Sequence, residues 1–532
     1  MNMKRIIPIL LLCVCAAAVS RDFSASVKKL LNAHYAVNTF YVDSVDEEKI
    51  LNAALVGMLK ELDPHSVYSS PEETKDLNEP LEGSFSGIGV SYNMQKDTLY
   101  VIETVAGGPS EKVGILPGDR IIAVNDTAIA GVKLKTKQIM KKLRGPKGTV
   151  VHLTVLRRSQ KAPLIFRVVR DKIPIYSVDA AYMIDPQSKT AYLRVSRFGA
   201  TTANEVATAL DSLQKAGMKQ LILDLSDNGG GYLSAAVEMA NEFLENNQTI
   251  VYTEGRNSPR SDAVAKGNGK YKKLPVVVVV NQYSASASEI LTGAIQDWDR
   301  GVVVGRRTFG KGLVQRPFQF EDGSMIRLTT ARYHTPSGRC IQKPYTKGDK
   351  ATYEHDIETR YKGGEFYHRD SIKVDESLRF NTLRHGRTIY GGGGIIPDVF
   401  VPLDTTCNTL YYRKLVARGI LNNYVIGYVD KNRKEVQSQY PAVQDFVNGF
   451  VVTDAMLDDF AGMGVADSIK IDTAQYERSK PLMRDQVKAL MARDIYTNDR
   501  GAYFRVMNGR NELVRTALEV ITDKKRFDSL LK

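Results

Sequence analysis

The sequence predicts a multidomain α/β protein whose core is preceded by a small β domain and flanked by helical regions. Three observations predict it. Strand and helix patterns alternate across residues 171–404. Short strands separated by glycine turns fill residues 80–170. Apolar residues recur at helical spacing in 21–79 and in parts of 405–532. A chain of 532 residues has room for about two to four domains.

Residues 1–20 have the features of a secretory leader. Lys4 and Arg5 give a positive start, and an apolar run over 6–18 is short for a bilayer span. Ala18-Val19-Ser20 is a small-residue cleavage site. We therefore expect export to the periplasm or cell envelope, with no stable membrane span in the mature chain.

Charge and cysteine content exclude several kinds of function. The formal charge is +13, but the basic residues are scattered and do not interleave with aromatics as in nucleic-acid sites. Cys340 and Cys407 follow the leader, and they could pair or be buried singly. The seven histidines do not cluster, and no zinc signature is present. We expect no nucleic acid, no metal and no other cofactor.

Each predicted region is built from recognisable elements. Residues 24–70 read as helical, and Asp63-Pro64-His65 ends the second helix of this region. The β domain has strand-like stretches and one helix, namely 86–90, 98–102, 120–124, 150–155 and the helix 136–143. The α/β core has strands at 191–195, 221–225, 276–280 and 302–304 and helices at 201–216, 232–244 and 289–298. A polar excursion over 343–390 interrupts the core, and 405–532 is mainly helical.

The five valines of 276–280 suit a strand covered on both faces, and serines follow it directly. Ser286 opens a helix, and Ser286 with Glu289 also forms the pattern of a capping box. The carboxyl end of such a strand is where α/β sheets place ligands, and helix N–H groups can stabilise an oxyanion there. Ser286 is the candidate nucleophile, while Ser284 and Ser288 stay possible on spacing alone.

Lys311 lies in the glycine-rich, partly apolar segment 305–315. Burial lowers the pKa of a lysine, and a neutral amine can take the proton of a serine hydroxyl. Gln315 is uncharged, so it could orient that amine. The alternative is a solvated loop lysine. The segment also matches a phosphate-binding loop except at Gly312, where Ser or Thr is needed, and residues 313–318 look extended instead of helical. Nucleotide binding is therefore not predicted.

A glycine turn at 228–231 follows another core strand and opens a helix. Its backbone N–H groups could approach a ligand closely, which would make it half of an oxyanion hole. Taken alone it is an ordinary tight turn. Asp224 and Asp227 beside it read as turn residues instead of a catalytic carboxylate pair.

Together these residues resemble the carboxyl-terminal processing proteases, the tail-specific serine peptidases. The matching stretches are 62–66, 85–89, 114–119, 224–231, 284–289, 308–315, 333–339 and 394–398, which span about residues 25–402. The order and spacing of these motifs carry the resemblance.

The resemblance implies a protease core of crotonase/Clp type with an inserted PDZ domain at 80–170. It makes Ser286 the nucleophile, Lys311 the general base and Gln315 the residue that positions the lysine. The implied oxyanion donors are the amides of Ala287 and of one glycine of the pair Gly230 and Gly231. The implied loop for a substrate's terminal carboxylate is formed by Gly87, Ile88, Gly89 and Val90, with the tail added as a strand.

The sequence departs from the family pattern at Ser226, where an arginine is usual, so a charge contact there is missing or supplied elsewhere. The 343–390 excursion is longer than in simple members, and 405–532 matches no motif. The predicted function is an exported endopeptidase that cleaves C-terminal tails of proteins, with an adaptor possible and the oligomeric state open. The alternatives are an inactive PDZ-bearing scaffold and a Ser-Lys amidase or esterase, which the PDZ-like region disfavours.

Overall fold

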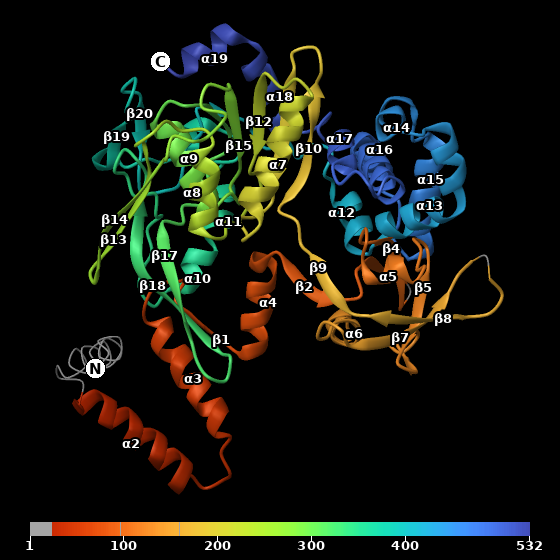
Figure 1. Cartoon of the computed structure of the whole chain (residues 1–532), viewed down its shortest axis with the longest axis horizontal. Coiled ribbons are helices and arrows are strands. Elements are labelled where there is room, and N and C mark those ends of the chain that lie inside the picture. Colours follow the sequence, from red (N-terminus) through yellow and green to blue (C-terminus); the bar gives the residue numbers. More distant parts are fainter. Residues whose placement is uncertain (1–23, 96, 159) are drawn as a thin grey trace, which may run out of the picture. The chain divides into compact units, whose positions relative to one another are not determined.

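The computed structural model describes residues 24–95, 97–158 and 160–532, so the predicted leader lies outside the described residues. Among the described helices, none combines the length and the apolar character that a membrane crossing needs. The chain divides into two compact units (Figure 1). The smaller unit comprises residues up to Pro71, Gln315–Thr329 and Tyr345–Tyr353, and the larger comprises Glu72–Val314, Thr330–Pro344 and Glu354–Lys532.

The smaller unit contains helices α2 (Ser24–Phe40) and α3 (Glu47–Lys60). Asp46 caps α3 by accepting the Lys49 N–H at 3.0 Å. Strand β1 (Val67–Ser69) pairs antiparallel with residues 325–327. The helical prediction for 24–70 is therefore wrong at 67–69, because the partner that makes this segment a strand comes from a distant part of the sequence.

The larger unit is built around a six-stranded sheet in the order β10-β11-β12-β15-β16-β21. Its strands are β10 (Val178–Asp185), β11 (Thr190–Val195), β12 (Gln220–Asp224), β15 (Val276–Val280), β16 (Val302–Gly305) and β21 (Val399–Phe400). β10 is antiparallel to its neighbour and the other pairs are parallel. The predicted α/β core, in which strands alternate with helices, is confirmed, and its sheet is mixed.

The alternate valines of β15 point to opposite faces of this sheet. Val276, Val278 and Val280 join the apolar cluster that includes α7 (Thr202–Lys215), α8 (Leu233–Asn241) and α9 (Ala287–Asp297). Val277 and Val279 join a second cluster with α18 (Glu512–Thr522) and Phe527 of α19 (Lys524–Leu530). The expectation of a strand covered on both faces is confirmed, and the second cover comes from the end of the chain (Figure 1).

The β domain is an antiparallel sheet of β3 (Val90–Gln95), β4 (Thr98–Thr104), β5 (Arg120–Val124), β7 (Val150–Leu156) and β8 (Leu164–Val169), with short β6 (Thr127–Ala128) beside β5. Helices α5 (Pro109–Lys112) and α6 (Thr136–Leu143) complete it. The stretch predicted as one strand at 86–90 divides: β2 (Ser84–Gly87) pairs with β9 (Asp171–Pro174), and β3 begins after Gly89, whose φ is +73°.

Other segments surround the core. The hairpin of β13 (Thr249–Gly255) and β14 (Ser258–Val264) pairs through β13 with residues 332–334 of β18 (Met325–His334). The excursion carries α10 (Lys350–Glu354), α11 (Asp356–Lys362), β19 (Arg379–Asn381) and β20 (Thr388–Tyr390). Helices α12 (Leu410–Ala417), α13 (Ile420–Gln439), α14 (Val443–Gly449), α15 (Asp454–Ala466), α16 (Thr473–Ile495) and α17 (Ala502–Met507) share an apolar core of their own.

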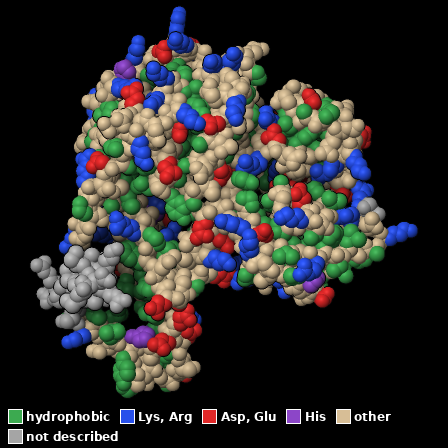
Figure 2. All heavy atoms as spheres, viewed as in Figure 1, with side chains coloured by type: hydrophobic (Ala, Val, Ile, Leu, Met, Phe, Trp, Pro, Cys, Tyr) green, Lys and Arg blue, Asp and Glu red, His purple; other side chains and the backbone are tan. Residues whose placement is uncertain are grey.

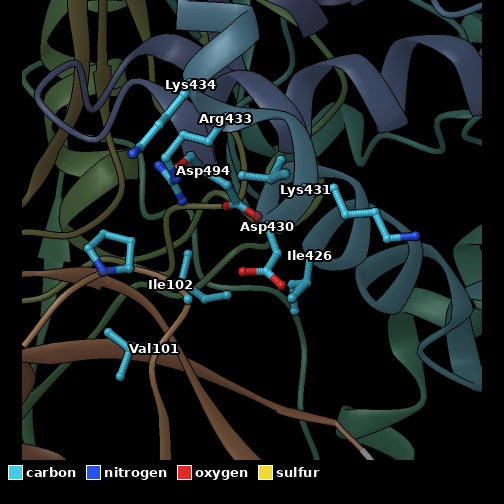
Figure 3. A pocket seen from close by; sticks show the side chains of 11 residues that line it. Val101, Ile102, Ile426, Asp430, Lys431, Arg433, Lys434 and Asp494 are labelled. Atoms are coloured by element: carbon cyan, nitrogen blue, oxygen red, sulfur yellow. The ribbon is translucent and has the colours of Figure 1, made fainter. Parts of the chain in front are cut away.

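The β domain meets this helical region at a pocket of about 230 Å³. Val101 and Gly118 line it from the β domain, and Ile426, Asp430 and Asp494 line it from the helices (Figure 3). Elsewhere on the surface, Figure 2 shows basic side chains spread among acidic ones on the visible face, in line with a scattered positive charge.

Candidate active site

Ser286 occupies the turn between β15 and α9 in a strained backbone conformation. Its φ is +58° and its ψ is −115°, a region that a residue with a side chain rarely adopts and that costs about 1–3 kcal/mol. The Ser286 N–H donates to Glu289 Oε2 at 2.8 Å, and the neighbouring Ala285 N–H donates to the Asn228 carbonyl at 3.0 Å. These bonds hold the turn in place, and strain of this kind is typical of functional positions.

The Ser286 hydroxyl is not used as a helix cap. The Glu289 N–H donates to the Ser286 carbonyl oxygen at 2.8 Å instead of to the hydroxyl. Within the part of the chain that the structure describes, no hydrogen bond of this hydroxyl is found, and the residue is partly exposed. The glutamate half of the predicted capping box therefore forms and the serine half does not.

The two neighbouring serines are buried and bonded to backbone. Ser284 Oγ donates to the Leu225 carbonyl at 2.7 Å and accepts the Asn281 N–H at 3.0 Å. Ser288 Oγ donates to the Asn228 carbonyl at 2.8 Å. Both side chains have no exposed surface. Their hydroxyls fasten the turn, which leaves Ser286 as the serine of this segment that a substrate can reach.

The loop that carries Lys311 is fastened to the same turn. Glu289 Oε2 accepts the Ser286 N–H at 2.8 Å and the Lys311 N–H at 2.9 Å, so one carboxylate oxygen holds both backbones. The Tyr333 hydroxyl contacts the same pair, since it lies 3.1 Å from the Ser286 carbonyl and also bonds to that of Lys311. Residues from two distant segments are thus brought together, with Lys311 itself half-buried.

The sequence pattern predicts only a helix cap at Glu289, whereas in the structure this residue holds two segments together. It is fully buried, and burial raises its pKa to about 7. The Thr308 hydroxyl and the N–H groups of Gly310, Lys311 and Ser286 donate to its carboxylate and oppose that rise. Glu289 and Tyr333 tie the serine turn to the lysine loop, a role that no local motif reveals.

The glycine turn lies against Ser286. A Cβ on Gly230 would meet the Ser286 Cβ at 2.8 Å and the Ala287 nitrogen at 3.0 Å. The Gly230 N–H donates to Asn228 Oδ1 at 2.9 Å, and the Gly230 carbonyl accepts the Phe198 N–H at 3.0 Å. Because a trans peptide places its C=O and N–H on opposite sides, the Gly231 N–H points away from Phe198. Ala287, as the first residue of α9, has no intrahelical acceptor for its N–H.

Replacing Gly230 by alanine is expected to lower activity strongly, because the new methyl group needs the space beside Ser286 and a φ of +100°. Gly229→Ala is the matched control, since nothing lies within 4 Å of a Cβ there. We expect kcat of Gly230→Ala to fall about 100-fold or more, with Gly229→Ala near wild type. Equal kinetics for the two variants would contradict this packing.

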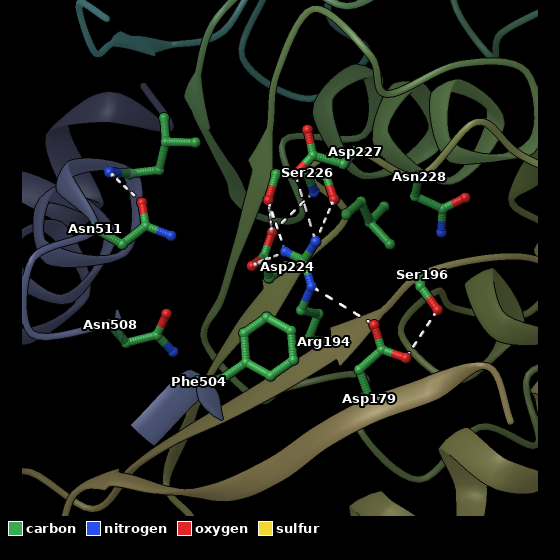
Figure 4. A network of polar contacts seen from close by, with 12 residues as sticks. Asp179, Arg194, Ser196, Asp224, Ser226, Asp227, Asn228, Phe504, Asn508 and Asn511 are labelled. Atoms are coloured by element: carbon green, nitrogen blue, oxygen red, sulfur yellow. Dashed lines mark hydrogen bonds and ion pairs between the residues drawn. The ribbon is translucent and has the colours of Figure 1, made fainter. Parts of the chain in front are cut away.

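Arg194 of β11 supplies the charge contact that Ser226 cannot make. Its Nη1 donates to Asp224 Oδ2 at 2.7 Å and to Ser226 Oγ at 2.9 Å, and its Nη2 donates to the Ser226 carbonyl at 3.1 Å (Figure 4). The guanidinium lies over the Phe504 ring of α17, 4.9 Å from its centroid. Asp224 and Asp227 are thus paired with an arginine, and the C-terminal helices support the glycine turn.

The remaining predicted residues lie as follows. Gln315 lies in β17 (Leu313–Gln319) and is the first residue of that strand to belong to the smaller unit; its side chain donates to Thr329 Oγ1 at 3.3 Å. The extended β17 confirms that no phosphate-loop helix follows Lys311. Cys340 and Cys407 are free thiols. Among the described residues, no group of three or more His, Cys, Asp or Glu side chains is arranged to hold a metal ion.

The predicted carboxylate loop has a defined backbone orientation. Gly87 ends β2, and Ile88 is buried in the β-domain core. The carbonyls of Ile88 and Gly89 accept the N–H groups of Ser110 and Val105, each at 3.0 Å. In a trans peptide the following N–H points the opposite way, so those of Gly89 and Val90 face away from residues 105–110.

Four segments of the chain match models of known families. Residues 189–352 match peptidase family S41, residues 76–156 match the PDZ domain, and residues 16–74 match the N-terminal domain of the activating protease CtpB. Residues 411–497 match a family of unknown function (DUF8443). The chain therefore carries a segment of the peptidase S41 family and a PDZ domain.

Curated relatives include a probable CtpA-like serine protease of Staphylococcus aureus (strain N315), 35% identical over 337 residues, which are 63% of this chain and 66% of that protein. One from Staphylococcus epidermidis (strain ATCC 12228 / FDA PCI 1200) is 35% identical over 61% of this chain and 65% of its own. The chain thus spans just under two thirds of each relative. A solved photosystem II D1 C-terminal processing protease is 29% identical, covering 60% of this chain and 90% of its own, with a TM-score of 0.33.

Proposed function

We propose that this protein is an exported serine endopeptidase that recognises the C-terminal tails of proteins and cleaves them through Ser286 and Lys311. The observation that carries the proposal is the shared carboxylate oxygen of Glu289, which holds the strained Ser286 and the Lys311 backbone together. The proposed regions are the leader 1–20, the helical 21–79, the PDZ domain 80–170, the peptidase core 171–404 and the helical 405–532.

In the proposed mechanism Lys311 Nζ, as a neutral amine, accepts the proton of Ser286 Oγ while that oxygen attacks the carbonyl carbon of the scissile bond. The negative oxygen of the tetrahedral intermediate accepts hydrogen bonds from the N–H groups of Ala287 and Gly231, and we favour Gly231 over Gly230 because the Gly230 N–H already donates to Asn228. The ammonium then gives its proton to the leaving amine, which leaves an acyl-enzyme.

Deacylation reverses these roles. A water molecule gives a proton to Lys311 as its oxygen attacks the ester, the Ser286 oxygen takes the proton back, and the shortened chain leaves as a carboxylic acid. Gln315 is proposed to orient the amine, because its amide can hydrogen-bond without adding a charge that would favour the ammonium.

The β domain is proposed to select substrates by their carboxyl ends. The N–H groups of Gly89 and Val90 face away from residues 105–110, and β3 begins at Val90. A terminal carboxylate could accept both N–H groups while the tail pairs with β3. Export rests on the leader sequence, and an adaptor protein stays a prediction from the sequence.

The proposal is tested by incubating wild type and Ser286→Ala with one folded protein that carries a flexible tail, prepared with a free or an amidated C-terminus. We expect wild type to cleave the free tail and to cleave the amidated tail at least about tenfold more slowly, since amidation removes the charge that the loop binds. New termini are identified by mass spectrometry. Tail binding without cleavage by wild type would indicate the scaffold alternative, and equal cleavage of both forms would reject tail selection.

A further inference from the structure

The polar excursion reaches back to the loop that carries Lys311. Arg360 of α11 donates from Nη1 to the Thr308 carbonyl at 3.0 Å and from Nη2 to the Arg307 carbonyl at 2.7 Å. Both carbonyls lie a few residues before Lys311. One planar guanidinium therefore fixes two consecutive peptide groups of this loop, a task that suits the fork geometry of arginine.

Glu365 joins Arg360 to a second arginine of the same loop. Its Oε1 accepts Arg360 Nε and Arg307 Nε, each at 2.9 Å, and its Oε2 accepts Arg307 Nη2 at 2.5 Å. Arg307 Nη1 also donates to the Gly393 carbonyl at 3.1 Å. The side chains of Arg360 and Glu365 are only 5% and 6% exposed. Burying such a triad costs desolvation energy, and its mutual hydrogen bonds together with those to the loop carbonyls offset that cost.

A second contact from the excursion holds the next residues of the loop. The Lys343 N–H donates to the Gly310 carbonyl at 2.9 Å, and Lys343 Nζ lies 4.0 Å from the Phe309 ring centroid. Asp356 at the start of α11 pairs with the same ammonium at 2.9 Å. Glu289 accepts the N–H groups of Gly310 and Lys311. Contacts from the excursion and from Glu289 therefore together clamp the loop over residues 307–311.

We propose that Arg360, Glu365 and Arg307 form a positioning triad that fixes the loop so that Lys311 meets Ser286. The triad acts through the backbone and does not touch the substrate. Its two guanidinium groups outweigh one carboxylate, and a nearby positive charge favours the neutral form of an amine. This inference rests on the proposed function, in which Lys311 is the general base.

The test compares Arg360→Ala, Arg360→Lys and the control Arg300→Ala. Arg300 is also buried and also donates to backbone carbonyls, those of Phe243, Tyr271 and Leu274, but it does not contact the lysine loop. For each purified full-length variant, kcat, KM and their pH dependence are measured on a tailed protein. Hydrogen exchange of the peptide covering 305–312 is followed by mass spectrometry.

For Arg360→Ala we expect kcat to fall about 100-fold with KM nearly unchanged, because misplacing a catalytic group slows the chemical step. The acidic limb of the pH profile should move to higher pH, since losing a positive charge and admitting water both favour the ammonium. The amides of Gly310 and Lys311 should exchange faster. Arg360→Lys keeps the positive charge, so its kcat and its loop exchange rate should lie between those of wild type and Arg360→Ala. Arg300→Ala should leave the exchange of the loop as it is in wild type.

The inference would be overturned if Arg360→Ala had the same kcat, the same acidic limb of the pH profile and the same loop exchange rate as wild type. If Arg360→Ala does not fold, Arg360→Lys and Glu365→Gln carry the same test. Failure of the proposed function looks different, because Lys311→Ala would then still cleave, whatever the Arg360 variants do. The exchange measurement reports the clamp even in that case.

Discussion

Ser286→Ala is expected to lower kcat about a millionfold, the scale of losing the nucleophile of a serine peptidase. The protein should still fold, because within the described residues the hydroxyl makes no hydrogen bond whose loss would cost stability. Alanine keeps the backbone N–H that Glu289 accepts and the carbonyl that Tyr333 contacts. The measurement is single-turnover cleavage of a tailed protein, with circular dichroism and thermal unfolding on the same sample.

Ser284→Ala and Ser288→Ala are the matched controls, one on each side of the nucleophile. Each removes a buried hydroxyl that bonds to a backbone carbonyl, so each should lower the free energy of unfolding by about 1–3 kcal/mol. Folded protein of either variant should keep most of its activity. Cleavage by Ser286→Ala at the wild-type rate would reject Ser286 as the nucleophile. The same conclusion would follow if Ser284→Ala or Ser288→Ala lost cleavage while Ser286→Ala kept it.

Lys311→Met is expected to lower kcat by on the order of 10⁴ or more, because methionine fills similar space but cannot accept a proton. The Lys311 N–H and carbonyl, which bond to Glu289 and Tyr333, are unchanged by this substitution. Lys272→Met is the control, since Lys272 bonds to the Gly267 carbonyl with its ammonium group and is not part of the proposed site. Retained cleavage by Lys311→Met would end the general-base assignment.

The pH dependence gives a second test of the lysine. Lys311 acts in its neutral form, so kcat should rise with pH through its pKa and reach a plateau. Glu289 must be considered as well, because burial raises its pKa to about 7. Glu289→Gln separates the two groups: it should lower kcat, since a side-chain amide cannot accept all four donors, but the limb should persist. If the rise of kcat with pH disappeared in Glu289→Gln, the titrating group would be Glu289 and not Lys311.

The pKa of Glu289 also sets the sign of a stability effect. In the unfolded chain this carboxyl loses its proton near its ordinary value of 4.5, whereas in the folded protein it keeps the proton to about pH 7. The native state binds more protons between these values, so this group makes the free energy of unfolding fall as pH rises through that window. Glu289→Gln should remove this contribution.

Short stretches of the sequence predict much of the fold. The run Val276–Val280 predicts a doubly covered strand, and the helix predicted at Thr136–Leu143 has the observed bounds. Local sequence does not predict the strand at residues 67–69, because a three-residue strand is decided by its partner at 325–327. The contact of Arg194 is not predicted for a similar reason, since nothing in its own strand indicates that it bonds to Ser226 in the turn after the neighbouring strand.

The sequence by itself determined the resemblance to the carboxyl-terminal processing proteases, the order of the core elements and the segments that hold the serine, the lysine and the glycine turn, because each depends on residue spacing within a short stretch. The tertiary structure decided that the hydroxyl of Ser286 is left out of the cap, that one buried glutamate fastens two distant loops, and that the end of the chain covers the core sheet. Those features depend on which segments meet in space. The residue pattern of one segment does not reveal which distant segment it will contact.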